Sequence, residues 1–173
     1  FADGVIGVVD GLLKDSSVPD LIWFTNIPTP YRIPTWEILH ARIKFHLIFL
    51  SKMELGRDWD LDNSLKGFSK SYLNERVLYP LTAVPIYFNF IKPIREIRKL
   101  RAKSIYIDGW ESPAFFMSAL QAKRQGMRLI YGYRSTQDSH RFTNFIIRKI
   151  RSSILSQADF IVTAGSASTK AVE

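Results

Sequence analysis

The hydrophobic pattern first predicts a strand, a loop and a helix over residues 21–40. Residues 21–24 are a continuous apolar block of strand length, and the proline-containing loop 26–32 ends it. Pro34 suits the first turn of the helix that follows. The apolar side chains that recur there at helical spacing are Ile33, Trp36, Ile38 and Leu39. A strand, a loop and a helix in this order open a βαβ unit.

Strand-like and helical patterns continue to alternate along the chain. Further strands are predicted at residues 46–51, 104–109, 128–133 and 159–165. Helices are predicted at residues 86–103, 112–126 and 142–156, and another is expected to begin at Ser166. Between them, residues 52–68 are polar and irregular, and loops of that length are often functional or mobile. The alternation predicts an α/β fold, a Rossmann-like parallel sheet flanked by helices.

Residues 1–20 do not fit this alternation. Their apolar side chains could line a helix, but each interior glycine weakens a helix by about 1 kcal/mol against alanine. The DSSVP segment that follows is typical of a linker. We therefore divide the chain into an N-terminal arm or linker of undetermined role, residues 1–20, and one Rossmann-like domain, residues 21–173.

The composition is that of a folded domain. The chain has 173 residues, 46% hydrophobic and 23% charged, which is enough for one domain with a sizeable core. It contains no cysteine, which excludes disulfides and thiolate metal sites and fits a reducing compartment such as the cytoplasm. No apolar run reaches the roughly 18 residues of a membrane span, so we expect neither a transmembrane helix nor a signal peptide.

The positive charge is concentrated in the second half of the chain. Residues 1–91 carry 9 basic and 10 acidic residues, whereas residues 92–173 carry 15 basic and 6 acidic residues. A surface with this excess should attract an anionic partner such as a phosphate, an acidic lipid, a nucleic acid or an acidic sugar.

Three loops should meet at the carboxyl edge of the sheet, where open parallel sheets bind ligands. They comprise residues 26–32, 108–112 and 134–141, and the first loop has neither a dinucleotide fingerprint nor a P-loop. Aromatic faces beside carboxylate and guanidinium groups suit a sugar, a phosphate or an acidic sugar. The candidates are Tyr31, Arg32, Asp108, Trp110, Glu111, Tyr133, Arg134, Asp138, His140 and Arg141.

Each candidate also has a plainer interpretation. The first loop could be only a stiff connection between strand and helix, and Asp108 could be a turn or capping carboxylate. Trp110 could be a packing residue instead of a sugar platform. His140 could act as a general base or could be a polar residue before a helix.

The order and spacing of four segments resemble a known enzyme family. The segments are NIPTPYRIP, DGWESPAFF, RSTQDSHRF and ADFIVTAGSAS, and together they span roughly residues 21–173. They are similar to the N-terminal domain of retaining, family-4-type glycosyltransferases with the GT-B fold. The residues that match the family patterns are Pro30, Tyr31, Arg32, Pro34, Gly109, Ser112, Pro113, Ser135, Thr136, Asp138, His140 and Arg141.

The resemblance implies an acceptor-binding half of an enzyme that transfers a sugar from a nucleotide-sugar donor to a glycan or lipid-linked acceptor, as in bacterial polysaccharide or glycolipid synthesis. It implies no cofactor beyond the donor. From the loop residues themselves, we predict His140 and Asp108 as the catalytic residues. The donor would bind to a second, C-terminal domain that this sequence does not contain, so we expect these residues alone to be inactive. Arg134 departs from the family, which usually has a glutamate there.

The basic helix within residues 86–103 is a candidate contact with an anionic membrane at its cytoplasmic face, or only a solvated helix face. Its basic residues are Lys92, Arg95, Arg98, Lys99, Arg101 and Lys103. A nucleic-acid-binding module and a non-catalytic α/β interaction domain are the alternatives to the enzyme. Binding that weakens steeply with salt would favour the nucleic-acid module, whereas Arg134 in place of the glutamate favours the interaction domain.

Overall fold

The computed structural model describes residues 18–57, 59–76, 78–79, 85–109, 112–134, 149 and 152–170. In this part of the chain, six strands form one parallel sheet in the order β3-β2-β1-β4-β5-β6. The strands are β1 (Leu21–Thr25), β2 (Phe45–Phe49), β3 (Lys70–Tyr72), β4 (Ser104–Ile107), β5 (Arg128–Tyr133) and β6 (Phe160–Thr163). This arrangement confirms the predicted α/β, Rossmann-like parallel sheet.

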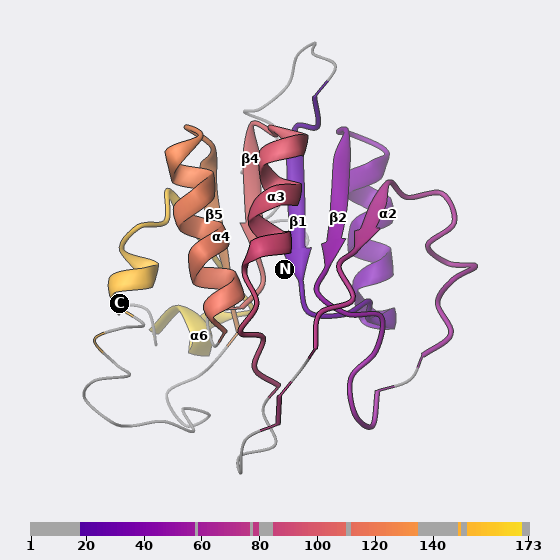
Figure 1. Cartoon of the computed structure of the whole chain (residues 1–173). Helices are drawn as coiled ribbons and strands as arrows, with labels where there is room; N and C mark the ends of the chain where they lie inside the picture. The colour runs from indigo at the N-terminus through magenta and orange to yellow at the C-terminus, as the bar shows by residue number, and fades with distance from the viewer. Residues whose placement is uncertain are drawn as a thin grey trace.

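Helices cover both faces of the sheet. A 3-10 turn, η2 (Pro30–Arg32), leads directly into α2 (Ile33–His40), and α2 lies on one face. The opposite face carries α3 (Ile91–Leu100) and α4 (Pro113–Arg124), which lie in front of the sheet in Figure 1. A short helix, α6 (Ser166–Lys170), follows β6. No described helix has the length and apolar character that crossing a membrane requires.

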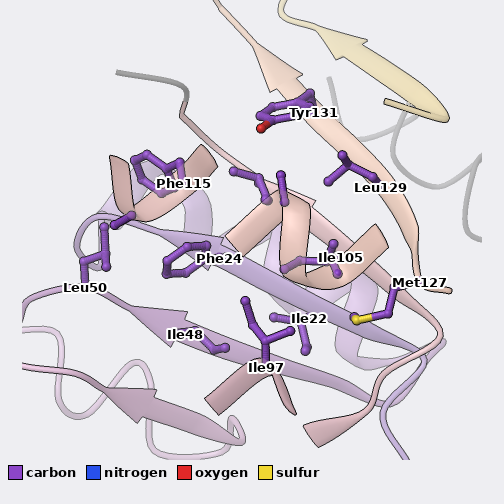
Figure 2. Packing of buried hydrophobic residues seen from close by; sticks show 14 of the residues in the cluster. Ile22, Phe24, Ile48, Leu50, Ile97, Ile105, Phe115, Met127, Leu129 and Tyr131 are labelled. Carbon is purple, nitrogen blue, oxygen red and sulfur yellow. The ribbon is translucent and has the colours of Figure 1, made fainter. Parts of the chain in front are cut away.

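The alternation of side chains along each strand divides the core into two layers. Along β1, Ile22 and Phe24 face α3 and α4, where they pack with Ile97 and Phe115 (Figure 2). Trp23, between them in sequence, points to the other face and packs near α2. Both layers are apolar, which explains why the central strands appear in the sequence as continuous hydrophobic runs.

The structure corrects three details of the sequence prediction. It adds β3, a three-residue strand at the sheet edge whose KSY sequence is only half-buried and gives no apolar signal. The helix expected from Ile86 begins at Ile91, because Ile86 instead forms an antiparallel bridge with Leu78. Ile38, expected to face the core, is 41% exposed. The predicted helix at residues 142–156 lies largely outside the described residues, as do residues 1–17.

Ser112 begins α4 as predicted, but its hydroxyl does not cap the helix. Its backbone is extended, and its Oγ accepts a hydrogen bond at 3.0 Å from the backbone N–H of Tyr87. In return, the N–H of Ala114 in the first turn donates to the Tyr87 carbonyl at 3.1 Å. The start of α4 is thereby fixed to the segment that leads into α3.

Candidate functional site

The chain changes direction across the sheet between β1 and β4. From β1 it continues outward through β2 and β3, whereas β4 begins the other half with β5 and β6. In open parallel sheets, the carboxyl ends of the two strands at such a switch point diverge into a crevice that holds ligands. The loop after β1 and the end of β4 meet at this point, at the lower edge of the sheet in Figure 1.

Strand register brings Thr25 and Asp108 together at this edge. Trp23 lies opposite Tyr106 in the β1–β4 pairing, and the N–H of Asp108 donates to the carbonyl of Phe24 at 3.0 Å. Thr25 and Asp108 are each two residues further along, so both side chains point to the face that α2 covers. The Thr25 hydroxyl donates to Asp108 Oδ2 over 3.4 Å.

Arg32 reaches the same carboxylate from the η2 turn. Its guanidinium forms an ion pair with Asp108 Oδ2, and it also lies over the Trp23 ring, 5.2 Å from the ring centroid. Arg32 is only 3% exposed. Because α2 begins at the next residue, the position of this arginine is fixed by the packing of that helix against the sheet.

Arg134 approaches the other oxygen of Asp108 from the end of β5. Its guanidinium lies 3.2 Å from Asp108 Oδ1 and also interacts with the Tyr31 hydroxyl. The Arg134 side chain is 42% exposed, and Tyr31 is 60% exposed. The four residues therefore form a connected group that runs from a buried ion pair to the surface, and we call Tyr31, Arg32, Asp108 and Arg134 the arginine cluster.

Gly132 provides the space that this cluster needs. It lies on β5 two residues before Arg134, on the same face. A β-carbon at this position would overlap the Tyr106 hydroxyl and would lie 3.1 Å from Asp108 Oδ1. The sequence analysis missed three residues of this site: Gly132, Tyr106 and Thr25. Each lies two positions from another residue of the site on its own strand, and such residues share a face of the sheet. That spacing is the signal that could have identified them.

Burial and charge act in opposite directions on the ionisable groups here. Burial raises the pKa of Asp108, while the guanidinium groups of Arg32 and Arg134 lower it in part. Burial, followed by the charge of Asp108, raises the pKa of Tyr106, so this phenol stays protonated at neutral pH. Burial opposes the charge of Arg134, but Asp108 and Tyr31 outweigh that effect and raise its pKa. Two guanidinium groups and one carboxylate give the cluster a formal charge of +1.

The structure brings four predicted site residues together, buries a fifth in the core, and does not describe the others. Tyr31, Arg32, Asp108 and Arg134 form the cluster described above. Tyr133, predicted as an aromatic face of the site, is instead 1% exposed, because alternation along β5 turns its side chain into the core on the face opposite Arg134. The remaining candidates lie outside the described residues: Trp110, Glu111, Ser135, Thr136, Asp138, His140 and Arg141. The catalytic assignments of His140 and Asp108 therefore stay predictions. Among the residues that the structure describes, no group of three or more His, Asp or Glu side chains could hold a metal ion.

A second surface combines exposed apolar side chains before and at the start of α3 with basic side chains that continue along α3 to its end. Three hydrogen-bonded contacts join its segments: Leu78 to Ile86, the Tyr87 hydroxyl to Glu54 Oε1 at 2.8 Å, and Leu55 N–H to the Tyr79 hydroxyl at 2.6 Å. We call this region the α3 surface. Its exposed apolar members are Leu55, Leu78, Tyr79, Phe88, Phe90 and Ile91. Its exposed basic members are Lys92, Arg95, Arg98, Lys99 and Arg101.

Lys103, the last basic residue predicted for this surface, is less exposed than the others, and like Lys92, which lies 3.3 Å from Glu75 Oε1, it pairs with a carboxylate. It is half-buried, and its ammonium pairs with Asp20 Oδ1 at 2.7 Å, at the edge of the sheet where β4 begins. In the described conformation Lys103 therefore joins the start of β4 to Asp20 and does not add an exposed charge to the α3 surface.

No protein-family model matches the sequence, and no curated protein matches it. Among solved structures, the fold is similar to that of MurG from Acinetobacter baumannii, a GT-B glycosyltransferase, with a TM-score of 0.50 and 9% sequence identity. The likeness covers 87% of this chain and 43% of the MurG chain, so this chain spans less than half the length of that protein. At this identity the likeness concerns the fold alone: the chain shares an α/β, Rossmann-like parallel sheet flanked by helices with part of MurG.

Proposed function

We propose that this chain is the acceptor-binding part of a GT-B-type glycosyltransferase. The enzyme would transfer a sugar from a nucleotide-sugar donor to a glycan or lipid-linked acceptor in bacterial polysaccharide or glycolipid synthesis, by a retaining, family-4-type reaction. The observation that carries the proposal is the position of the arginine cluster, at the switch point of a sheet whose fold resembles a glycosyltransferase.

The exposed part of the cluster suits a carbohydrate. Tyr31 presents an aromatic face on which the C–H side of a sugar ring can stack. The Arg134 guanidinium offers N–H donors at a position that Asp108 fixes. A nucleotide-sugar donor would bind to a second domain, where charge stabilisation of the departing diphosphate would promote transfer. In this proposal His140 orients or deprotonates the acceptor hydroxyl.

Sugar transfer by a chain that includes a donor-binding domain tests this proposal. The purified enzyme is incubated with a panel of nucleotide sugars and lipid-linked or soluble glycans, and products are identified by mass spectrometry. We expect transfer that His140→Ala and Asp108→Asn reduce and that His40→Ala, at the exposed end of α2, leaves unchanged. Residues 1–173 alone should bind acceptor without transferring sugar, and turnover by them would contradict the proposed division of roles.

The α3 surface supports peripheral attachment to the cytoplasmic face of a membrane. Leu55 is 81% exposed, and the neighbouring apolar side chains could enter the lipid interface while the arginines and lysines of α3 contact anionic headgroups. Each basic residue near such a surface contributes about 1 kcal/mol. This placement would give the enzyme access to a lipid-linked acceptor.

Vesicle sedimentation tests the attachment. Binding should be strong to vesicles with anionic lipid, weak to zwitterionic vesicles, and reduced by salt. Arg95→Glu with Lys99→Glu should release the protein, whereas Arg42→Glu with Lys44→Glu, which makes the same charge change at exposed positions outside the α3 surface, should not. Equal release by both pairs, or preferential binding to oligonucleotides, would contradict a membrane role for the α3 surface.

A further inference from the structure

The arginine cluster contains one more positive charge than its carboxylate can neutralise. Asp108 is 1% exposed in its side chain, and the ion pair with the buried Arg32 compensates its charge where water cannot. Arg134 Nη2 lies 3.2 Å from the other oxygen of the same carboxylate, and its side chain is 42% exposed. The excess charge therefore belongs to the more exposed arginine.

We propose that Arg134, with Tyr31, is a binding subsite for an oxyanion, a phosphate or a carboxylate, carried by the acceptor. That the anion belongs to an acceptor rests on the proposed function. The anion binding itself is inferred from the geometry of the cluster. The guanidinium interacts with both Asp108, at 3.2 Å, and Tyr31, and the Arg134 side chain is 42% exposed at the carboxyl end of β5. A guanidinium that is already oriented loses little entropy when it binds an anion bidentately.

The surroundings of the guanidinium favour an anion over a neutral hydroxyl. The only acidic side chain within ion-pair distance of Arg134 among the described residues is Asp108, and Arg32 shares that carboxylate. The Arg134 side chain is 42% exposed, so water stabilises its charge only in part. A hydrogen bond to a charged group also contributes more than one between neutral groups.

Nuclear magnetic resonance of arginine side chains tests the proposal directly. The Arg134 Nε–H signal is followed while inorganic phosphate, a glycosyl phosphate, a uronic acid, the matching neutral sugar and a nucleoside diphosphate are each added to the chain. We expect the phosphate-bearing and carboxylate-bearing sugars to shift this signal at lower concentration than the neutral sugar does. The glycosyl phosphate and the uronic acid distinguish the two sources of the anion.

Variants separate this subsite from nonspecific attraction. Arg134→Gln should weaken binding of the anionic sugar about tenfold or more, and Arg134→Lys should restore only part of it. Arg128→Gln is the matched control, because Arg128 is an exposed arginine at the opposite end of the same strand. Unfolding curves establish that each variant is folded.

The results also distinguish this inference from the proposed function. Anion binding that is lost in Arg134→Gln, without any sugar transfer by the longer enzyme, would support the subsite and contradict the enzymatic role. Sugar transfer to neutral acceptors without anion binding at Arg134 would support the enzymatic role and contradict the subsite. Equal weakening by Arg128→Gln, preference for the nucleoside diphosphate, or no shift with any anion would overturn the subsite.

Discussion

The Arg32 guanidinium and the Asp108 carboxylate form an ion pair in which neither side chain is more than 4% exposed. The two residues come from the loop after β1 and the end of β4, so the pair joins the two halves of the sheet at its switch point. Removing charged groups from water is costly, and the Thr25 hydroxyl and Arg134 provide additional polar contacts to the carboxylate that offset part of this cost.

Breaking this pair should destabilise the domain strongly. Arg32→Met leaves the Asp108 carboxylate buried with only the half-exposed Arg134 beside it, and we expect a loss of about 3 to 5 kcal/mol in the free energy of unfolding. Urea denaturation measures this loss. The double variant Arg32→Met with Asp108→Leu should recover much of it, because no buried charge then remains, and a double variant as unstable as the single one would contradict the argument.

A side chain at Gly132 should disrupt the cluster by overlap. Gly132→Ala places a β-carbon against the Tyr106 hydroxyl and close to Asp108, which should cost about 1 to 3 kcal/mol. Thermal unfolding measures the change, and Gly132→Ala with Tyr106→Phe should recover part of it. Gly67→Ala is the control, since a β-carbon there meets no atom within 4 Å. Equal effects of the two glycine variants would show that overlap is not the cause.

His46 should make the edge of the sheet sensitive to acid. Its Nδ1 lies 2.7 Å from Ser69 Oγ and its Nε2 2.9 Å from Ser71 Oγ, while Ser71 donates to Glu96 at 2.6 Å. Because the Ser71 proton points to Glu96, Nε2 donates to Ser71, and in the neutral ring Nδ1 then accepts from Ser69. Burial lowers the pKa of His46 from 6.5; Glu96 opposes this effect and Lys99 adds to it.

The folded state therefore favours neutral His46, and this stabilisation is present above pH 6.5 and is lost as the pH falls through the lowered pKa. We expect the urea midpoint to fall between pH 7 and pH 5 more in the wild type than in His46→Gln, which does not titrate. His40→Gln, at an exposed position, should behave like the wild type. Parallel pH profiles of the wild type and His46→Gln would exclude this role.

The sequence predicts the central strands and part of the cluster because their signals are local. The strand expected at residues 128–133 is β5 with the same bounds, since the apolar run RLIYGY is buried from its second residue onward. Polar residues that directly follow buried parallel strands gather at one edge of the sheet. This rule is enough to predict that Arg32, Asp108 and Arg134 lie near one another.

The remaining contacts depend on relations that a local pattern does not contain. Thr25 and Asp108 are 83 positions apart in the sequence, and only the register of β1 against β4 makes them neighbours. The need for glycine at position 132 likewise comes from a tyrosine on the neighbouring strand. The helix expected at Ile86 begins later because the bridge to Leu78 and the contacts of Tyr87 hold the preceding segment extended.

The hydrogen bond from Tyr87 to Glu54 should stabilise the conformation of the α3 surface. The Tyr87 hydroxyl donates to the buried Glu54 carboxylate at 2.8 Å, and Arg57 reaches the same carboxylate at 3.4 Å from the solvent side. Tyr87→Phe should cost about 1.5 to 3 kcal/mol and should increase hydrogen exchange at residues 54–57 and 78–79. Tyr131→Phe is the control, since its buried hydroxyl has no hydrogen-bond partner among the described residues and its loss should cost little. If the two variants have equal stability and exchange, the α3 surface does not depend on the Tyr87 hydroxyl.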